Sequence, residues 1–130
     1  MKLGLFILWA MLSICPVLLL AQEIPTGVFS ALKGGRVEQL AIYMGPQVEL
    51  IMESRKVATN REVTVEKLTD FFANNKAREY SVNHQGKRDE SGFIIGTLTT
   101  AGGLFRVNCF FKLSENQYII HQIRIDKSND

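Results

Sequence analysis

The chain has 130 residues and a formal charge of +2, which is enough for one domain. A nearly neutral domain gives no reason to expect nucleic acid or an anionic membrane surface as a partner. With 2 cysteines and 2 histidines in the sequence, neither a disulfide framework nor a structural zinc site is expected. No motif for a cofactor is present, so none is predicted.

The N-terminal segment has the order of a secretory signal peptide. Met1 and Lys2 give a positive start, an apolar run extends from Leu3 to Leu20, and the chain turns polar after Ala21. This order predicts residues 1–21 to be a signal peptide and the protein to be periplasmic or secreted. Cleavage is expected after Ala21 or one residue later, which would leave 22–130 as a single domain.

Two other fates of this segment stay open. A retained membrane anchor is one, because the apolar run approaches the ~20 residues that span a bilayer. A lipid-modified Cys15 is the other, although Ile14 stands where a lipobox normally has Gly or Ala. Cleavage would remove Lys2 and Cys15, so the mature domain would have a formal charge of +1 and Cys109 as its single thiol.

The first part of the mature chain predicts two short helices and two strands. An apolar stripe at Val28, Phe29 and Leu32 predicts a helix that ends at Gly34-Gly35. A second helix is expected over 37–44, ended by Gly45-Pro46. Residues 47–52 alternate between apolar and polar positions and predict a strand, with a brief second strand at 57–58.

A third helix is predicted from Thr59 to about Asn74. Thr59 and Glu62 fit a capping box, in which each side chain bonds the backbone amide of the other. Apolar residues recur at helical spacing behind this start, so their face is expected to be buried. These residues are Val65, Leu68 and Phe72, with Phe71 beside them.

Four antiparallel strands are predicted to close the chain, at residues 80–85, 93–100, 104–113 and 118–125. Gly102-Gly103 predicts a two-residue hairpin turn between the second and the third. A three-residue loop at 114–116 would place Cys109 directly across from His121 on the last strand. The apolar face of the last two strands is then Phe105, Val107, Cys109, Phe111, Leu113, Ile119, His121, Ile123 and Ile125.

The opposite face of these strands mixes aromatic, aliphatic and cationic residues. Such a mixture suits a protein interface, including a homodimer through the sheet face. A partly exposed face with scattered apolar residues is the simpler alternative. The interface candidates are Phe110, Tyr118, Ile120, Arg106 and Arg124, and the same register adds Phe93 and Ile95.

The order of these elements predicts an α+β fold, in which three helices pack on a curved antiparallel sheet. It resembles the cone-shaped nuclear transport factor two-like fold. More narrowly, it is similar to a family of small exported bacterial proteins of unknown function with that fold. The resemblance is carried by Ile24-Pro25-Thr26-Gly27, Ala31-Leu32-Lys33-Gly34-Gly35, Val48-Glu49-Leu50, Asp70-Phe71-Phe72, His84-Gln85-Gly86, Gly96-Thr97-Leu98 and Gln122-Ile123-Arg124-Ile125.

Related cones, ketosteroid isomerase among them, place carboxylates in an apolar cavity. The predicted inner face holds no carboxylate, which favours a non-enzymatic module that binds a small apolar ligand or another protein. The alternative is an isomerase, cyclase or hydrolase-like enzyme with His121 and Cys109 in its pocket, where a Cys–His pair activates a thiolate. Tyr43 and His84 are the remaining candidates for lining such a pocket.

Overall fold

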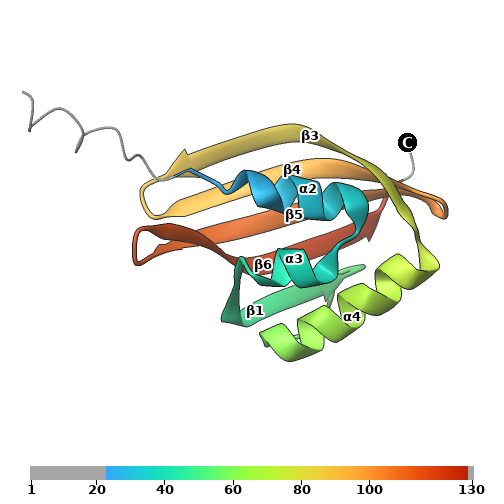
Figure 1. Ribbon diagram of the computed structural model, residues 1–130, viewed down its shortest axis with the longest axis horizontal. Coiled ribbons are helices and arrows are strands. Elements are labelled where there is room, and N and C mark those ends of the chain that lie inside the picture. The colour runs from blue at the N-terminus through green and yellow to red at the C-terminus, as the bar shows by residue number, and fades with distance from the viewer. Residues whose placement is uncertain (1–22, 129–130) are drawn as a thin grey trace, which may run out of the picture.

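The computed structural model describes residues 23–128, and in this range three helices lie on one face of a six-stranded sheet (Figure 1). The predicted α+β class is confirmed. The predicted signal peptide lies outside the described residues. The elements are α2 (Thr26–Gly34), α3 (Val37–Ala41), β1 (Met44–Met52), β2 (Arg55–Ala58), α4 (Arg61–Asn74), β3 (Ala77–Arg88), β4 (Ser91–Thr100), β5 (Gly103–Ser114) and β6 (Gln117–Lys127).

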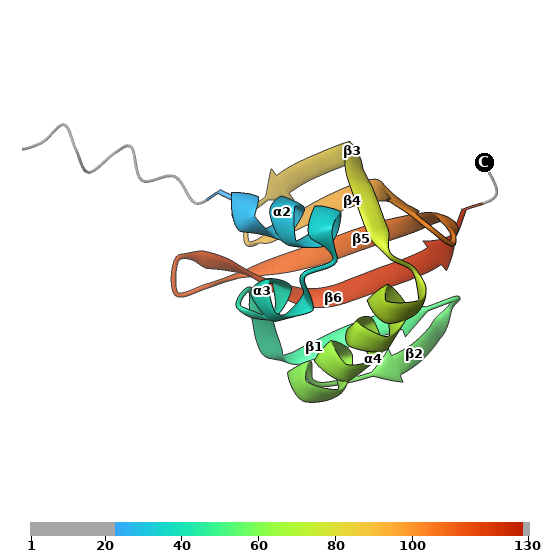
Figure 2. The same cartoon turned by 45° about the vertical axis from the view of Figure 1, so that its right-hand side comes forward.

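The strands follow the order β2-β1-β6-β5-β4-β3 across the sheet. Neighbouring strands are antiparallel with one exception, since β1 and β6 run parallel. The sheet was expected to be antiparallel throughout. A parallel pair needs a long connection between its strands, and here the whole chain from β2 to β5 supplies it. The sheet curves around the helices, with α4 over β1 and β2 (Figure 2).

The two short helices end for different reasons. Gly35 follows α2 with a φ of 63°, and the amide of Arg36 donates to the carbonyl of Ala31 at 2.8 Å. This left-handed cap is the end that Gly34-Gly35 predicts. Helix α3 ends at Ala41, earlier than expected, because the carbonyl of Tyr43 already accepts from the β6 amide of Ile120 at 2.7 Å.

The N-cap of helix α4 is one residue later than predicted, and the proposed capping box is wrong. Asn60 is the N-cap, and its Oδ1 accepts from the Val63 amide at 2.9 Å. The buried face is also offset, because the side chains that point to the sheet are Thr64, Leu68 and Phe71. The predicted Val65 and Phe72 flank this face and are half-buried.

The hairpin between β4 and β5 turns at Ala101-Gly102, since Thr100 pairs with Gly103. The hydroxyl of Thr100 sets this turn, because it accepts from the Gly102 amide at 3.0 Å and donates to the Gly103 carbonyl at 2.8 Å. The pairing differs from the prediction by two positions. An even shift leaves every side chain on its expected face, so the predicted faces of β4 and β5 are confirmed.

Strand β6 contains one residue more than its partner, and this residue is His121. Phe111 pairs with Ile120 while Phe110 pairs with Gln122, so His121 is skipped in the pairing with β5. Such a β-bulge reverses the alternation of side chains along the strand. The inward residues are therefore Tyr118 and Ile120 before the bulge, and Ile123 and Ile125 after it.

The pairing of β5 with β6 corrects two predictions. Tyr118 and Ile120 are buried in the core and do not lie on the outer face, whereas Ile119 faces outward and is half-buried. The β5–β6 loop also has two residues rather than three, because Ser114 pairs with Gln117. Glu115 and Asn116 have φ values of 49° and 67°, which is the backbone of a type I′ hairpin turn.

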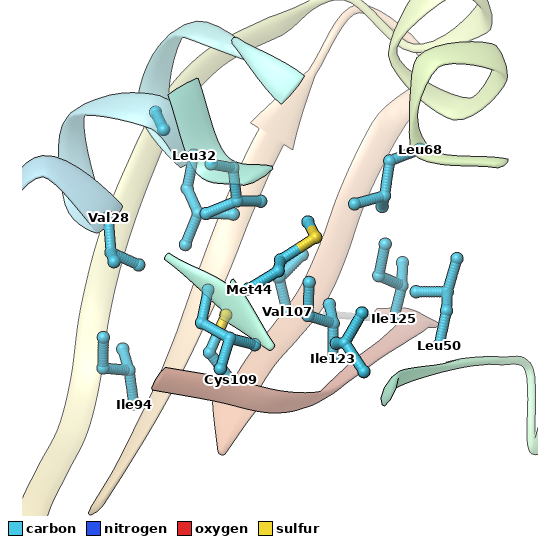
Figure 3. Packing of buried hydrophobic residues seen from close by; sticks show 14 of the residues in the cluster. Val28, Leu32, Met44, Leu50, Leu68, Ile94, Val107, Cys109, Ile123 and Ile125 are labelled. Atoms are coloured by element: carbon cyan, nitrogen blue, oxygen red, sulfur yellow. The ribbon is translucent and has the colours of Figure 1, made fainter. Parts of the chain in front are cut away.

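One hydrophobic core fills the space between the helices and the inner face of the sheet. Figure 3 shows Val28 and Leu32 of α2 and Leu68 of α4 pointing toward the strands. The polar tip of Tyr80 is satisfied inside this core, because its hydroxyl donates to the Val107 carbonyl at 2.8 Å. Among the described residues, no helix is long and apolar enough to cross a membrane.

Candidate functional site

The face of the sheet away from the helices carries an apolar patch. Phe93 on β4 pairs with Phe110 on β5, and Ile95 lies one pleat further along β4. All three side chains are half-buried. We call these three residues the outer patch.

Charged residues of both signs surround the outer patch. Arg106, Lys112 and Arg124 supply positive charge, and Glu49 and Asp126 supply negative charge. Nε of Arg124 lies 3.4 Å from Oδ2 of Asp126. Of the predicted interface candidates, Phe110, Arg106 and Arg124 therefore lie on this face together.

His84 and Tyr43 do not meet in the interior of the cone. His84 is exposed on β3, and its ring lies 5.2 Å from the ring of Phe93 at the edge of the outer patch. Tyr43 is half-buried, and its ring and hydroxyl lie where a side chain on Gly27 of α2 would have to be. Tyr43 therefore helps to pack α2 against the connection between α3 and β1.

Cys109 is fully buried on the inner face, where it pairs with Ile94 on β4 and Ile123 on β6. The predicted pairing with His121 is wrong, because the two-residue loop and the bulge each shift the register by one residue at this level. Burial raises the pKa of the Cys109 thiol to about 12. The thiol is thus protonated at neutral pH, and it is not activated by a histidine across the strand.

We expect Cys109 to react slowly with a thiol reagent in the native protein at neutral pH, at the rate at which the structure opens. The measurement is the time course of labelling by an aromatic disulfide, with the same chain in denaturant as the control. Labelling should speed up sharply in denaturant. Rapid native labelling that slows in His121→Ala would instead reveal an activated thiolate.

His121 lies at a cleft between β1 and β6. Met44 on β1 pairs with Ile120 on β6, and Glu49 pairs with Gln122. Between these two pairs, residues 45–48 of β1 lie opposite His121 alone. The segment includes Pro46, which has no amide to contribute to the ladder. The strands separate here and leave a cavity of about 410 Å³. We call it the bulge cleft, and its side chains include Pro46, Glu49, Lys112, Ile119, His121 and Gln122.

Hydrogen bonds hold the carboxylate of the bulge cleft in its ionised form. Oε2 of Glu49 lies 3.1 Å from Nζ of Lys56, and Oε1 accepts from Nε2 of Gln122 at 3.4 Å. Lys56 and Gln122 lower the pKa of Glu49. Within residues 23–128 there is no group of three or more histidine, cysteine or acidic side chains that could hold a metal ion.

The histidine of the bulge cleft is held in its neutral form. Burial lowers the pKa of His121, and the charge of Lys112 lowers it further, against the opposing effect of Glu49. In the part of the chain that the structure describes, Lys112 makes no ion pair. The bulge cleft therefore combines a neutral imidazole, an unpaired ammonium group and an ionised carboxylate that is already paired with Lys56.

The sequence predicted His121 but not the other side chains of the bulge cleft. Glu49 alternates with Val48 and Leu50, a pattern typical of a solvent-facing strand residue. The sequence did contain one signal of the bulge, since Tyr118, Ile119 and Ile120 are three apolar residues in succession. A half-buried strand cannot keep strict alternation through such a run, so it indicates a break of phase.

Residues 25–126 match a family described as a domain of unknown function, DUF4783. A crystal structure of a DUF4783 family protein from Bacteroides ovatus ATCC 8483 superposes with a TM-score of 0.81. That protein is 51% identical to this one, and the match covers 85% of this chain and 100% of the other. A search of curated proteins found no match.

More distant structures share the fold. A protein from Streptomyces avermitilis, named as a dehydratase of the NTF2-like family, superposes with a TM-score of 0.61 at 14% identity, over 81% of this chain and 91% of that one. A Thiobacillus denitrificans protein, named as a calcium/calmodulin-dependent protein kinase type II association domain, has a TM-score of 0.65 at 7% identity, over 84% and 98%. At these identities the likeness shows the NTF2-like fold alone.

Proposed function

The chain belongs to the DUF4783 family of domains of unknown function, and from its NTF2-like structure we propose that it is an exported interaction module that self-associates through the outer patch. The observation that carries the proposal is the pairing of Phe93 with Phe110 on the face of the sheet opposite the three helices of residues 23–128. An antiparallel sheet with one solvated face normally alternates apolar-in and polar-out. Two paired aromatic side chains on the solvated face depart from that pattern.

The composition around the outer patch suits a protein partner. Aromatic residues and arginine are enriched at interfaces, and on this face Arg124 pairs with Asn108, the residue between Arg106 and Phe110 along the outer side of β5. Buried aromatic side chains also contribute most of the binding energy at many interfaces. The outer patch can therefore supply the centre of an interface, with the arginines at its rim.

The charges around the outer patch favour a second copy of this chain as the partner. A two-fold dimer places the same patch of both protomers in contact. Such a patch must complement itself, and this one has Arg106 and Arg124 together with Glu49 and Asp126. Opposite charges on one surface can pair across a two-fold axis, whereas a patch of one sign would repel itself. One distant neighbour in fold is itself named an association domain.

We expect residues 22–130 to form a dimer that Phe110→Asp dissociates, because an aspartate would be buried unpaired at the centre of the interface. Sedimentation velocity over a concentration series measures this equilibrium. Ile42→Asp is the matched control, since it places the same charge on an apolar side chain that is 73% exposed at the end of α3. A wild-type chain that stays monomeric up to about 0.1 mM contradicts the proposal.

An apolar ligand inside the cone and a cone-type enzyme have less support. The inner face is filled by packed side chains, as Figure 3 shows around Met44, Val107 and Cys109. The predicted enzyme requires His121 and Cys109 in one pocket, but these residues lie on different faces of the sheet.

Export is the remaining part of the proposal and rests on the order of residues 1–21. We expect the protein purified from its native host to begin at Gln22 or Glu23. Intact mass spectrometry measures this directly. A mass that includes the apolar run, or a diacylglycerol group on Cys15, would contradict cleavage and favour an anchored protein.

A further inference from the structure

We propose that the bulge cleft binds a small organic carboxylate with an apolar body. The carboxylate group lies at Lys112 and His121, and the apolar body lies against Pro46 and Ile119. This site adjoins the outer patch, with Lys112 on the shared border, and extends from there toward the β5–β6 hairpin, where Ile119 pairs with Lys112. The proposal does not depend on self-association.

The shape of the bulge cleft is the first argument. Two backbone irregularities meet at one level of the sheet, the bulge at His121 and the irregular stretch of β1 between Met44 and Glu49. Bulges commonly lie next to functional sites, where they change the direction of a side chain. The resulting volume of about 410 Å³ is in the lower part of the range for small-molecule sites.

The charge of the bulge cleft is the second argument. Glu49 is already bonded to Lys56 and Gln122, while Lys112 makes no ion pair within the described residues. One positive charge is therefore uncompensated, which favours an anion over a cation. An exposed lysine alone contributes little binding energy. His121 supplies the second contact, because a neutral imidazole still donates one N–H.

The apolar side of the bulge cleft is the third argument, and it selects among anions. The bulge turns Ile119 outward, and a side chain at Gly45 would come within 3.2 Å of its Cγ2 atom. Glycine at this position therefore leaves the isoleucine accessible from the cleft, beside exposed Pro46. An alkyl or aromatic body gains from contact with these side chains, a gain that inorganic phosphate or sulfate lacks.

The test is a nuclear magnetic resonance titration of ¹⁵N-labelled residues 22–130 with sodium octanoate, and with octylammonium as the probe of opposite charge. Octanoate is expected to give saturable amide shifts centred on Ile119, His121 and Gln122. It is also expected to raise the pKa of His121, since a bound carboxylate favours the imidazolium form. Octylammonium is expected to give neither effect.

Two matched variants separate the site from general adsorption. Lys112→Gln should weaken octanoate binding by about fivefold or more, because one charge-assisted hydrogen bond is lost. Lys76→Gln removes an exposed lysine next to the β4–β5 turn, at the other end of the sheet, and should have no effect. Both changes are at exposed positions, so the variants should fold alike.

Three results would overturn the proposal. The first is the absence of saturable shifts in the wild-type chain. The second is equal binding of octanoate and octylammonium, or equal binding by the two variants. The third is a set of shifts centred on core residues such as Leu32 and Val107, which would place the ligand inside the cone.

Discussion

Deletion of His121 is expected to change the free energy of unfolding by less than about 1 kcal/mol, because it removes only the unpaired residue of the bulge. Without His121, Ile120 is followed directly by Gln122, so regular alternation keeps Tyr118, Ile120, Ile123 and Ile125 on the inner face. Each of these side chains is at most 5% exposed, and full burial of one is worth roughly 1.5–3 kcal/mol. A deletion that turned two of them outward would therefore cost about 3 kcal/mol or more.

Substitution of the same residue gives the control for this deletion. His121→Ala keeps the number of residues in β6 and therefore the bulge, and the lost side chain is only half-buried. Its cost should stay under about 1 kcal/mol. Urea unfolding followed by circular dichroism measures both variants. A loss of about 3 kcal/mol or more for the deletion alone would show that the inward face of β6 depends on the extra residue.

Local sequence patterns correctly predicted much of the fold. Gly34-Gly35 correctly predicted the end of α2, because a left-handed cap is a short-range requirement that glycine meets best. The faces of β4 and β5 were also predicted correctly, although the turn was misplaced. A turn error of two positions in the pairing is harmless to side-chain direction, whereas an odd error reverses every residue.

The failures come from interactions that the local sequence does not determine. Thr59 and Asn60 are both good N-cap residues, and only the packed position of α4 decides between them. The alternation of β6 was extended through His121 because a bulge is set by the pairing of two strands, not by one. The prediction of a Cys109–His121 pair followed from that error together with the loop predicted one residue too long.

Local sequence patterns could not predict the bulge cleft for the same reason. Glu49 and Gln122 are 73 residues apart and meet only because β1 pairs with β6 in parallel. The sequence shows a run of strands at the end of the chain, but not which earlier strand lies beside the last one. Of the cleft side chains, His121 alone stood out, as a polar residue in an apolar run.

Phe110 and Phe111 offer the sharpest test of the two faces, since they are adjacent residues of one type. Phe111 is fully buried on the inner face, and Phe110 is half-buried on the outer face. Phe111→Ala is expected to cost about 3–5 kcal/mol, because truncation leaves a cavity in the core. Phe110→Ala should cost under about 1 kcal/mol in a dilute, monomeric sample.

Protein concentration then separates folding from self-association. Binding between native protomers stabilises them by mass action, so the gap between wild type and Phe110→Ala should widen as the concentration rises. The gap for Phe111→Ala should stay nearly constant, because Phe111 acts through the core of each protomer. Urea melts at two concentrations, far apart, measure both gaps. A constant gap for Phe110→Ala would contradict a dimer at the outer patch, and a small loss for Phe111→Ala would contradict the assignment of the inner face.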